Sequence, residues 1–200
     1  MVDEEKVIDL VRSRKFGAMS TEQMARKVQV GGDEMEGFRE LLHDMERRGL
    51  VVNVKADRWV NPDRSALTVG RLECNPRGFA FVIPVRGADQ YIYVSGDDLR
   101  DAMHGDLVAV ETRRRKGNGR RRRRERGPSG RVIKVIEHAN DRLVGRFVPG
   151  RKFARVEPDN PRLFRDIYVA QDDTRGAEMD DQVVVRLTEW PSRHRNPEGI

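Results

Sequence analysis

The sequence predicts a multidomain α + β protein, with one small helical domain followed by two copies of a small all-β domain. Two observations carry this prediction. Apolar residues recur at helical spacing in the first third of the chain, whereas residues 66–200 hold short apolar runs between polar turns. These runs also repeat themselves at a spacing of about 75 residues. A chain of 200 residues has room for three such domains.

The composition favours small cores, because the hydrophobic fraction is 37% and the charged fraction is 36%. No apolar run approaches the roughly 20 residues of a membrane span, and the charged N-terminus does not fit a signal peptide. We therefore expect a soluble, cytoplasmic protein with no membrane contact. The single cysteine, Cys74, excludes an intramolecular disulfide. The net charge of +6 is unevenly distributed: residues 113–126 hold ten Arg or Lys and one Glu and carry +9, so the rest of the chain carries −3.

Residues 1–62 carry the helical signals. A first helix fits residues 3–14, and Ser20-Thr21-Glu22-Gln23 has the spacing of a capping box that opens a second. A third fits residues 33–48, and two short strands follow it. Three helices followed by a hairpin predict a winged helix-turn-helix domain.

Folds of this kind often read DNA with the third helix. Here that helix holds six acidic residues and three basic ones, so its surface would repel a phosphate backbone. A docking or regulatory role, with an unknown protein partner, is therefore favoured. A DNA-binding regulator remains an alternative, because Lys55 and Arg58 near the predicted wing could touch nucleic acid at its edge.

The repeat defines two further domains, at residues 66–138 and 141–200. Val69-Gly70-Arg71-Leu72 returns as Val144-Gly145-Arg146-Phe147, and residues 106–110 return as 181–185. The first copy offers five short strands, near residues 68–73, 79–84, 91–94, 106–111 and 130–137. Five strands with a helical turn after the third suit an oligonucleotide-binding (OB) barrel.

The second copy reaches the start of its fifth strand at Gly199-Ile200. We therefore expect the second barrel to be incomplete, truncated before its last strand, and the sequence to be part of a longer protein.

One stretch of the first copy, Arg77-Gly78-Phe79-Ala80-Phe81, suggests a binding surface. Alternation along a strand puts Phe79 and Phe81 on one face, and Tyr91 and Tyr93 occupy a second strand with the same spacing. Aromatic side chains on neighbouring strands, beside an arginine such as Arg77, form a platform for single-stranded nucleic acid. On the pattern alone, a core position for both phenylalanines is equally open.

These two strands resemble the RNA-binding strands of the cold-shock domain. The resemblance implies that Phe79, Phe81 and Tyr93 stack on bases, whereas Ser95 stands where that family often has histidine. The second copy keeps Phe153 and Tyr168 at the matching positions. Arg155 replaces its second phenylalanine, and an arginine can stack on a base or hold a phosphate.

A basic loop, residues 112–129, separates the fourth and fifth strands of the first copy. Its glycines and lack of an apolar face predict a mobile loop. Beside a stacking surface it would add affinity for backbone phosphates, although a solvated loop without a task is the alternative. Its candidate RNA-binding residues are Arg113, Arg114, Arg115, Lys116, Arg120, Arg121, Arg122, Arg123 and Arg124.

No catalytic residue and no metal site is predicted. The four histidines share no ligand spacing, and no serine or cysteine lies in a nucleophile context. The acidic residues 172–181 invite a metal site, but they occupy the place of residues 97–106 in the first copy. We therefore expect them to form the helical turn and strand entry of the barrel.

The whole order of domains, with Glu189-Trp190-Pro191 and Arg195-Asn196-Pro197-Glu198-Gly199 near the end, resembles the N-terminal part of the bacterial ribonuclease R family, in the ribonuclease II/R superfamily. The resemblance implies capture and guidance of single-stranded or structured RNA for a 3′→5′ exoribonuclease. That family's Mg²⁺-dependent catalytic domain, with its Asp-x-Asp-Asp motif, would follow, so no cofactor is expected here. A free-standing RNA chaperone is the first alternative and a DNA-binding regulator the second.

Overall fold

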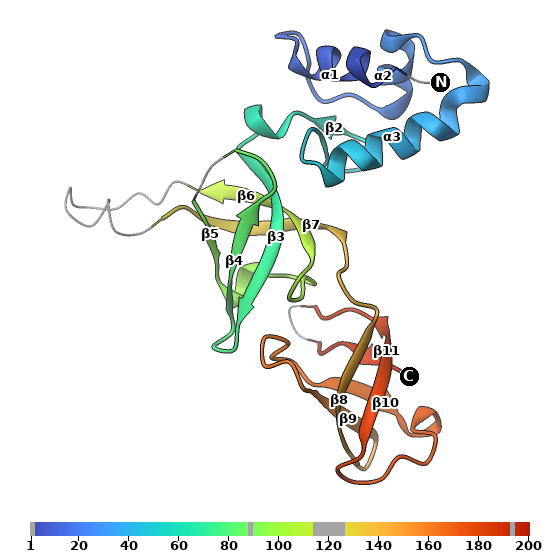
Figure 1. Cartoon of the computed structure of the whole chain (residues 1–200), viewed down its shortest axis with the longest axis vertical. Coiled ribbons are helices and arrows are strands. Elements are labelled where there is room, and N and C mark those ends of the chain that lie inside the picture. The colour runs from blue at the N-terminus through green and yellow to red at the C-terminus, as the bar shows by residue number, and fades with distance from the viewer. Residues whose placement is uncertain (1–2, 88–89, 114–126, 193–194) are drawn as a thin grey trace, which may run out of the picture.

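The structure is a computed structural model that describes residues 3–87, 90–113, 127–192 and 195–200. A helical unit and two β-barrels follow one another along the long axis of the molecule (Figure 1). Among the described residues, no helix is long and apolar enough to cross a membrane.

The helical unit packs three α-helices around a buried core that includes Phe38, Leu42 and Trp59. Its elements are α1 (Glu4–Arg12), α2 (Thr21–Val28), the 3-10 turn η1 (Gly32–Glu34), α3 (Met35–Arg47), β1 (Val52–Asn53) and β2 (Trp59–Val60). The capping box at Ser20 is confirmed, since its hydroxyl accepts from the Gln23 backbone N–H and the Gln23 side chain accepts from the Ser20 N–H. The two strands pair as a short antiparallel sheet.

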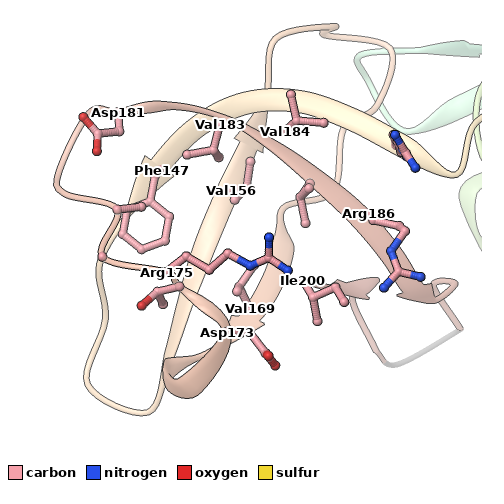
Figure 2. A pocket seen from close by; sticks show the side chains of 15 residues that line it. Phe147, Val156, Val169, Asp173, Arg175, Asp181, Val183, Val184, Arg186 and Ile200 are labelled. Carbon is pink, nitrogen blue, oxygen red and sulfur yellow. The ribbon is translucent and has the colours of Figure 1, made fainter.

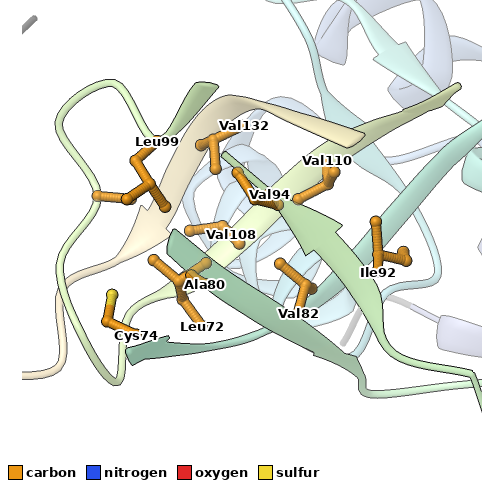
Figure 3. Packing of buried hydrophobic residues seen from close by; sticks show 11 residues of the cluster. Leu72, Cys74, Ala80, Val82, Ile92, Val94, Leu99, Val108, Val110 and Val132 are labelled. Atoms are coloured by element: carbon orange, nitrogen blue, oxygen red, sulfur yellow. The ribbon is translucent and has the colours of Figure 1, made fainter. Parts of the chain in front are cut away.

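Barrel one is closed by five strands in the order β3-β4-β5-β7-β6. These are β3 (Leu67–Asn75), β4 (Phe79–Pro84), β5 (Ile92–Val94), β6 (Leu107–Arg113) and β7 (Ser129–Glu137), with the 3-10 turn η3 (Gly96–Asp98) after the third. Alternate residues point inward, so that Leu72, Val82 and Val108 belong to a buried hydrophobic core (Figure 3). The predicted strand set and helical turn are confirmed.

Barrel two repeats this plan, with the order β8-β9-β10-β12-β11. Its elements are β8 (Arg142–Val148), β9 (Phe153–Pro158), β10 (Ile167–Ala170), the 3-10 turn η4 (Gln171–Asp173), β11 (Gln182–Glu189) and β12 (Glu198–Gly199). The register repeats as well: Val144 pairs with Val184 as Val69 pairs with Ala109. The internal repeat is confirmed.

The prediction that barrel two lacks its closing strand is wrong. In barrel one the fifth strand closes the barrel through two residues, because Ser129 and Gly130 are its parallel partners to β5. Glu198 and Gly199 make the same pairing with β10. Glycine is required at this crossing, since a Cβ at Gly130 would lie 2.3 Å from Val110 Cγ1 and one at Gly199 2.6 Å from Val185 Cγ2.

The acidic residues 172–181 are explained by the repeat, as predicted. Their first part forms η4, the counterpart of η3. Their last residue, Asp181, accepts the Glu178 backbone N–H at 2.8 Å, just as Asp106 accepts the Met103 N–H at 2.8 Å. These carboxylates hold the turn that leads into β11 and β6.

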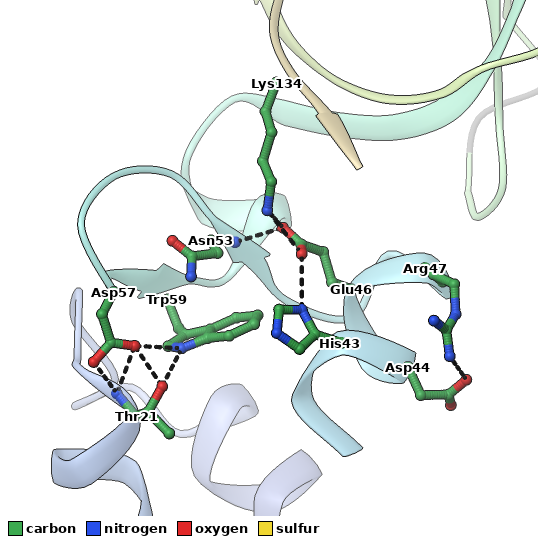
Figure 4. Close-up of polar contacts among 9 residues, drawn as sticks. All are labelled: Thr21, His43, Asp44, Glu46, Arg47, Asn53, Asp57, Trp59 and Lys134. Carbon is green, nitrogen blue, oxygen red and sulfur yellow. Dashed lines mark hydrogen bonds and ion pairs between the residues drawn. The ribbon is translucent and has the colours of Figure 1, made fainter. Parts of the chain in front are cut away.

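Side chains from all three units meet at the two junctions. Glu46 on α3 receives Lys134 from β7 at 2.8 and 2.9 Å (Figure 4). Between the barrels, the rings of His138 and Trp190 stack with their centroids 4.2 Å apart.

Candidate functional site

Four aromatic side chains gather on the outer wall of barrel one: Phe79, Phe81, Tyr91 and Tyr93. We call them the aromatic surface. Strand alternation places them there, because Ala80 and Val82 take the inward positions of β4 and are fully buried. Phe81 is 39% exposed and Tyr91 60%, and neither phenylalanine belongs to the core. The alternative in which Phe79 and Phe81 face the core is wrong.

The four rings form a continuous group. Phe81 lies opposite Tyr93 in the β4–β5 register, and their ring centroids are 5.9 Å apart. Phe79 lies 5.7 Å from both Phe81 and Tyr93, and Tyr91 extends the group 6.5 Å beyond Phe81. Solvent-accessible rings at these spacings, two exposed and two half-buried, offer π-faces on which successive bases can stack, with little dependence on base identity.

Polar residues border the aromatic surface. Tyr93 pairs with Ser129, which pairs in turn with Arg113 at the end of β6. Arg113 and Arg77 are both exposed. Ser95 is directed elsewhere, because its hydroxyl donates to the Asp98 carboxylate at 2.8 Å and holds the turn after β5.

The other basic residues predicted to bind RNA lie within residues 114–126, outside the described part of the chain. They are Arg114, Arg115, Lys116, Arg120, Arg121, Arg122, Arg123 and Arg124. The chain enters this segment directly after Arg113, beside Ser129 and hence close to Tyr93 in the sheet register.

Barrel two carries a smaller aromatic pair at the matching place. Phe153 is 56% exposed and Tyr168 40%, and their rings lie 6.3 Å apart at an interplanar angle of 27°. Arg155 is the register partner of Tyr168. The structure therefore brings the three predicted residues of barrel two together.

Arg155 forms ion pairs with two acidic neighbours, and these pairs were not predicted from the sequence. Its guanidinium lies 3.3 Å from Glu157 and 3.9 Å from Asp166. Arg146 also bonds Glu157, and this hydrogen bond lowers the pKa of the exposed Glu157 carboxyl. The signal was present, because Arg155 and Glu157 are two apart on one strand and share a face.

The described residues hold no group of three or more His, Cys, Asp or Glu side chains that could bind a metal ion. The chemistry that the aromatic surface offers is stacking and hydrogen bonding.

Comparison with family models matches both barrels. Residues 70–135 match the ribonuclease B OB domain, and residues 156–200 match a cold shock domain.

Comparison with curated proteins gives ribonuclease R from several bacteria. The Escherichia coli (strain K12) protein is 31% identical over 181 residues, which cover 90% of this chain and 21% of that protein. The Thermotoga maritima protein is 32% identical over 189 residues, covering 93% of this chain and 23% of that protein. The chain thus spans between a fifth and a quarter of the length of these two relatives.

Solved structures share the fold at lower identity. RNase R of Mycoplasma genitalium, in complex with ribose methylated single-stranded RNA, has a TM-score of 0.54 at 18% identity, covering 66% of this chain and 20% of that one. Yeast Ssd1, described as a pseudonuclease, has a TM-score of 0.54 at 22% identity, covering 69% of this chain and 23% of that one. The sequence matches and the two barrels together show that the chain belongs to the ribonuclease R family, of which it represents the N-terminal cold-shock and OB-fold region.

Proposed function

We propose that this chain captures single-stranded RNA on the aromatic surface of barrel one and guides it, as the N-terminal part of a ribonuclease R-like 3′→5′ exoribonuclease. The observation that carries the proposal is the cluster of four rings on one wall of an OB barrel, of which Phe81 and Tyr91 are exposed and Phe79 and Tyr93 are half-buried. The RNA complex of the Mycoplasma genitalium relative supports the same ligand class. A cytoplasmic location, where RNA is available as a ligand, is part of this proposal.

Barrel one would supply most of the binding free energy. Each base that stacks on an aromatic ring contributes about 1–3 kcal/mol, and barrel one offers twice as many rings as barrel two. Arg155 must exchange Glu157 and Asp166 for a phosphate before it can help, which lowers its contribution. Barrel two then acts as a secondary contact for the strand.

The basic residues 113–126 would add affinity that does not depend on sequence. Their net charge of +9 attracts the RNA backbone and releases counterions on binding. No cofactor is proposed for these 200 residues. The Mg²⁺ that hydrolysis requires would belong to the family's catalytic domain.

The helical unit would be a winged helix used for docking rather than for DNA binding. The arginines of α3 are already matched by acids: Arg39 pairs with Glu36, and Arg47 and Arg48 both pair with Asp44. A helix neutralised in this way offers little attraction to a phosphate backbone.

The test is fluorescence anisotropy with a labelled single-stranded oligoribonucleotide. Phe81→Ala and Tyr93→Ala should each weaken binding by about 1–3 kcal/mol, because each removes one stacking ring. Met179→Ala is the matched control, since Met179 is an exposed apolar side chain of barrel two, 55% accessible.

The melting temperature separates a binding defect from a folding defect. The proposal predicts weaker RNA binding by Phe81→Ala at a nearly unchanged melting temperature. Unchanged affinity together with a much lower melting temperature would refute the proposed role of the ring. Preference for duplex DNA over single-stranded RNA would instead support a DNA-binding regulator.

A further inference from the structure

A pocket lies on the outer wall of barrel one, beside the aromatic surface. It encloses about 300 Å³, at the lower end of the range for small-ligand sites. Strands β3 and β4 and the turn before β6 line it, with side chains that include Arg71, Glu73, Ile83 and His104. The pocket thus combines an apolar contact with two opposite charges.

The strand register places this pocket next to the rings. Glu73 in β3 is the partner of Phe81 in β4, and Phe81 is the partner of Tyr93 in β5. Directly opposed residues of an antiparallel pair project from the same face of the sheet, with Cβ atoms about 4.5–5.5 Å apart. Arg71 lies two residues before Glu73, so it shares this face, and its partner is Ile83. A base in the pocket would therefore be the neighbour of a base that stacks on Phe81.

The charges of Arg71 and Glu73 are available to a ligand, because both side chains are exposed. Within the described ranges, Glu73 makes no hydrogen bond or ion pair, and Arg71 donates only from Nη1, to the Gly105 carbonyl oxygen at 3.3 Å. Burial lowers the pKa of His104, so its ring is neutral at neutral pH. The charged groups of the pocket are therefore one free carboxylate and one guanidinium with most of its donors free.

Barrel two repeats these strands without the open pair of charges. Phe147 points into barrel two (Figure 2), so Arg146 and Val148 on either side of it face outward. They are the counterparts of the charged pair in barrel one, and Val148 has no carboxylate. Arg146 is already held by two acids, Glu157 and Asp180. The fold alone therefore does not produce the open pair, which is specific to barrel one.

A free carboxylate beside an RNA-binding surface favours a hydrogen-bond donor on a base. Phosphates are negatively charged, so Glu73 repels them. Among the four bases, guanine alone presents two adjacent donors, N1–H and N2–H, and it carries the acceptors O6 and N7 on the neighbouring edge. The two oxygens of a carboxylate accept such a pair of donors, and an arginine fork donates to O6 and N7. The chemistry of Glu73 and Arg71 together therefore matches guanine.

We propose that this pocket selects guanine in the single-stranded RNA that lies on the aromatic surface. Glu73 accepts from guanine N1–H and N2–H, Arg71 donates to O6 and N7, and Ile83 packs against the face of the base. The other three bases lack the paired donors, so they leave the carboxylate without partners. This inference rests on the RNA-binding proposal and adds a preferred base to it.

The test is fluorescence anisotropy of the whole chain with labelled oligouridine octamers that hold one central guanine, adenine or hypoxanthine. The guanine octamer should bind about tenfold more tightly than the adenine octamer, which is within the usual discrimination of one bidentate base contact. Both bases are purines, so this comparison keeps stacking nearly constant. Hypoxanthine has N1–H and O6 but lacks the N2 amino group, so its octamer should bind with an intermediate affinity.

Glu73→Ala should abolish the preference for guanine. Its affinity for the adenine octamer should be unchanged or slightly higher, because the substitution removes a negative charge and no contact with that base. Glu40→Ala is the matched control, since Glu40 is an exposed acid on α3 and its loss changes the net charge equally. This control should keep the guanine preference, and both variants should melt at the temperature of the parent chain.

Equal affinity of the parent chain for the guanine and adenine octamers would overturn the proposal. The proposed RNA-binding function would still stand if Phe81→Ala weakened the binding of both. A guanine preference that persists in Glu73→Ala would also overturn it, because another part of the chain would then read the base. Equal weakening of both octamers by Glu73→Ala would assign Glu73 to the ribose 2′-hydroxyl instead. If no octamer bound, the proposed function and the pocket would both be refuted.

Discussion

Cys74, the single cysteine of the chain, is buried where the two barrels meet. Cys74 lines a small pocket together with Leu163 of barrel two. Burial, and after it the negative charge of Asp106, raise the pKa of the Cys74 thiol to about 12. The thiol is therefore protonated at neutral pH and is a poor nucleophile.

We predict that the Cys74 thiol resists alkylation while the chain is folded. At pH 8, iodoacetamide should label it slowly in buffer and rapidly in urea. The folded pKa lies above the unfolded value of about 8.5, so this group's contribution to stability is intact below that value and is lost as the pH rises toward 12. Equal labelling rates in buffer and in urea would show that the barrel junction is open.

At the residue scale, the sequence predicted the placement of the aromatic side chains better than their surroundings. Strand alternation was enough to place Phe79 and Phe81 on one face, although only the structure shows which face is outside. The pair of Arg155 with Glu157 was signalled by their spacing on one strand, whereas its pair with Asp166 was not, because Asp166 reaches it from a different part of the chain. A contact of this kind depends on the register between neighbouring strands, and the residue pattern alone does not determine that register.

At the scale of elements, the pair Glu46–Lys134 joins α3 to β7. Glu46 is 1% exposed and also accepts the Asn53 backbone N–H at 2.8 Å. Its carboxylate thus accepts from Asn53 of the helical unit and from Lys134 of barrel one, which lies 88 positions after Glu46. The net effect of the pair is to fix the orientation of the two units.

We predict that Lys134→Met destabilises the chain, because it leaves the Glu46 carboxylate buried without its cation. Breaking such a pair costs about 3–5 kcal/mol, and the partial exposure of Lys134 favours the lower end. Urea unfolding gives the measurement. Arg131→Met is the matched control, since its pair with Glu111 is more exposed and should contribute about 0–1 kcal/mol. A similar loss of unfolding free energy in the two variants would contradict a structural role for Lys134.

The basic segment gives the second prediction at this scale. Deleting residues 114–126 should weaken binding to all RNA sequences alike and reduce the salt dependence of binding. Each lost phosphate contact removes about 0.7 from the slope of log K against log salt on a single strand. A segment of equal length with glutamine at every basic position is the control for loop length. An unchanged slope after deletion would show that the segment does not contact RNA.

Element boundaries followed local signals where these existed. The capping box at Ser20 marked a helix start, and the repeat gave the same strands in both barrels. Closure of barrel two by Glu198 and Gly199 was missed, because a two-residue strand has no periodicity of its own. Its pairing depends on tertiary contact with β10.

At the scale of the whole molecule, the chain is a row of three units, two of which present aromatic side chains. Hydrolysis by the family's route needs carboxylates that converge on metal ions and activate water. We predict that these 200 residues bind end-labelled single-stranded RNA without shortening it in Mg²⁺ or Mn²⁺. Progressive 3′ shortening that persists through repurification, and is lost on changing Asp172, Asp173, Asp180 and Asp181 to Asn, would contradict this.

Two-dimensional ¹H–¹³C spectra of the aromatic side chains, recorded during titration with a single-stranded oligoribonucleotide, show directly whether RNA lies on the aromatic surface of barrel one. We predict that the ring signals of Phe79, Phe81, Tyr91 and Tyr93 shift upfield under the ring current of stacked bases. The signal of Phe38, buried in the helical unit, should stay in place. Saturable binding that leaves those four signals unmoved would mean that RNA binds elsewhere on the chain.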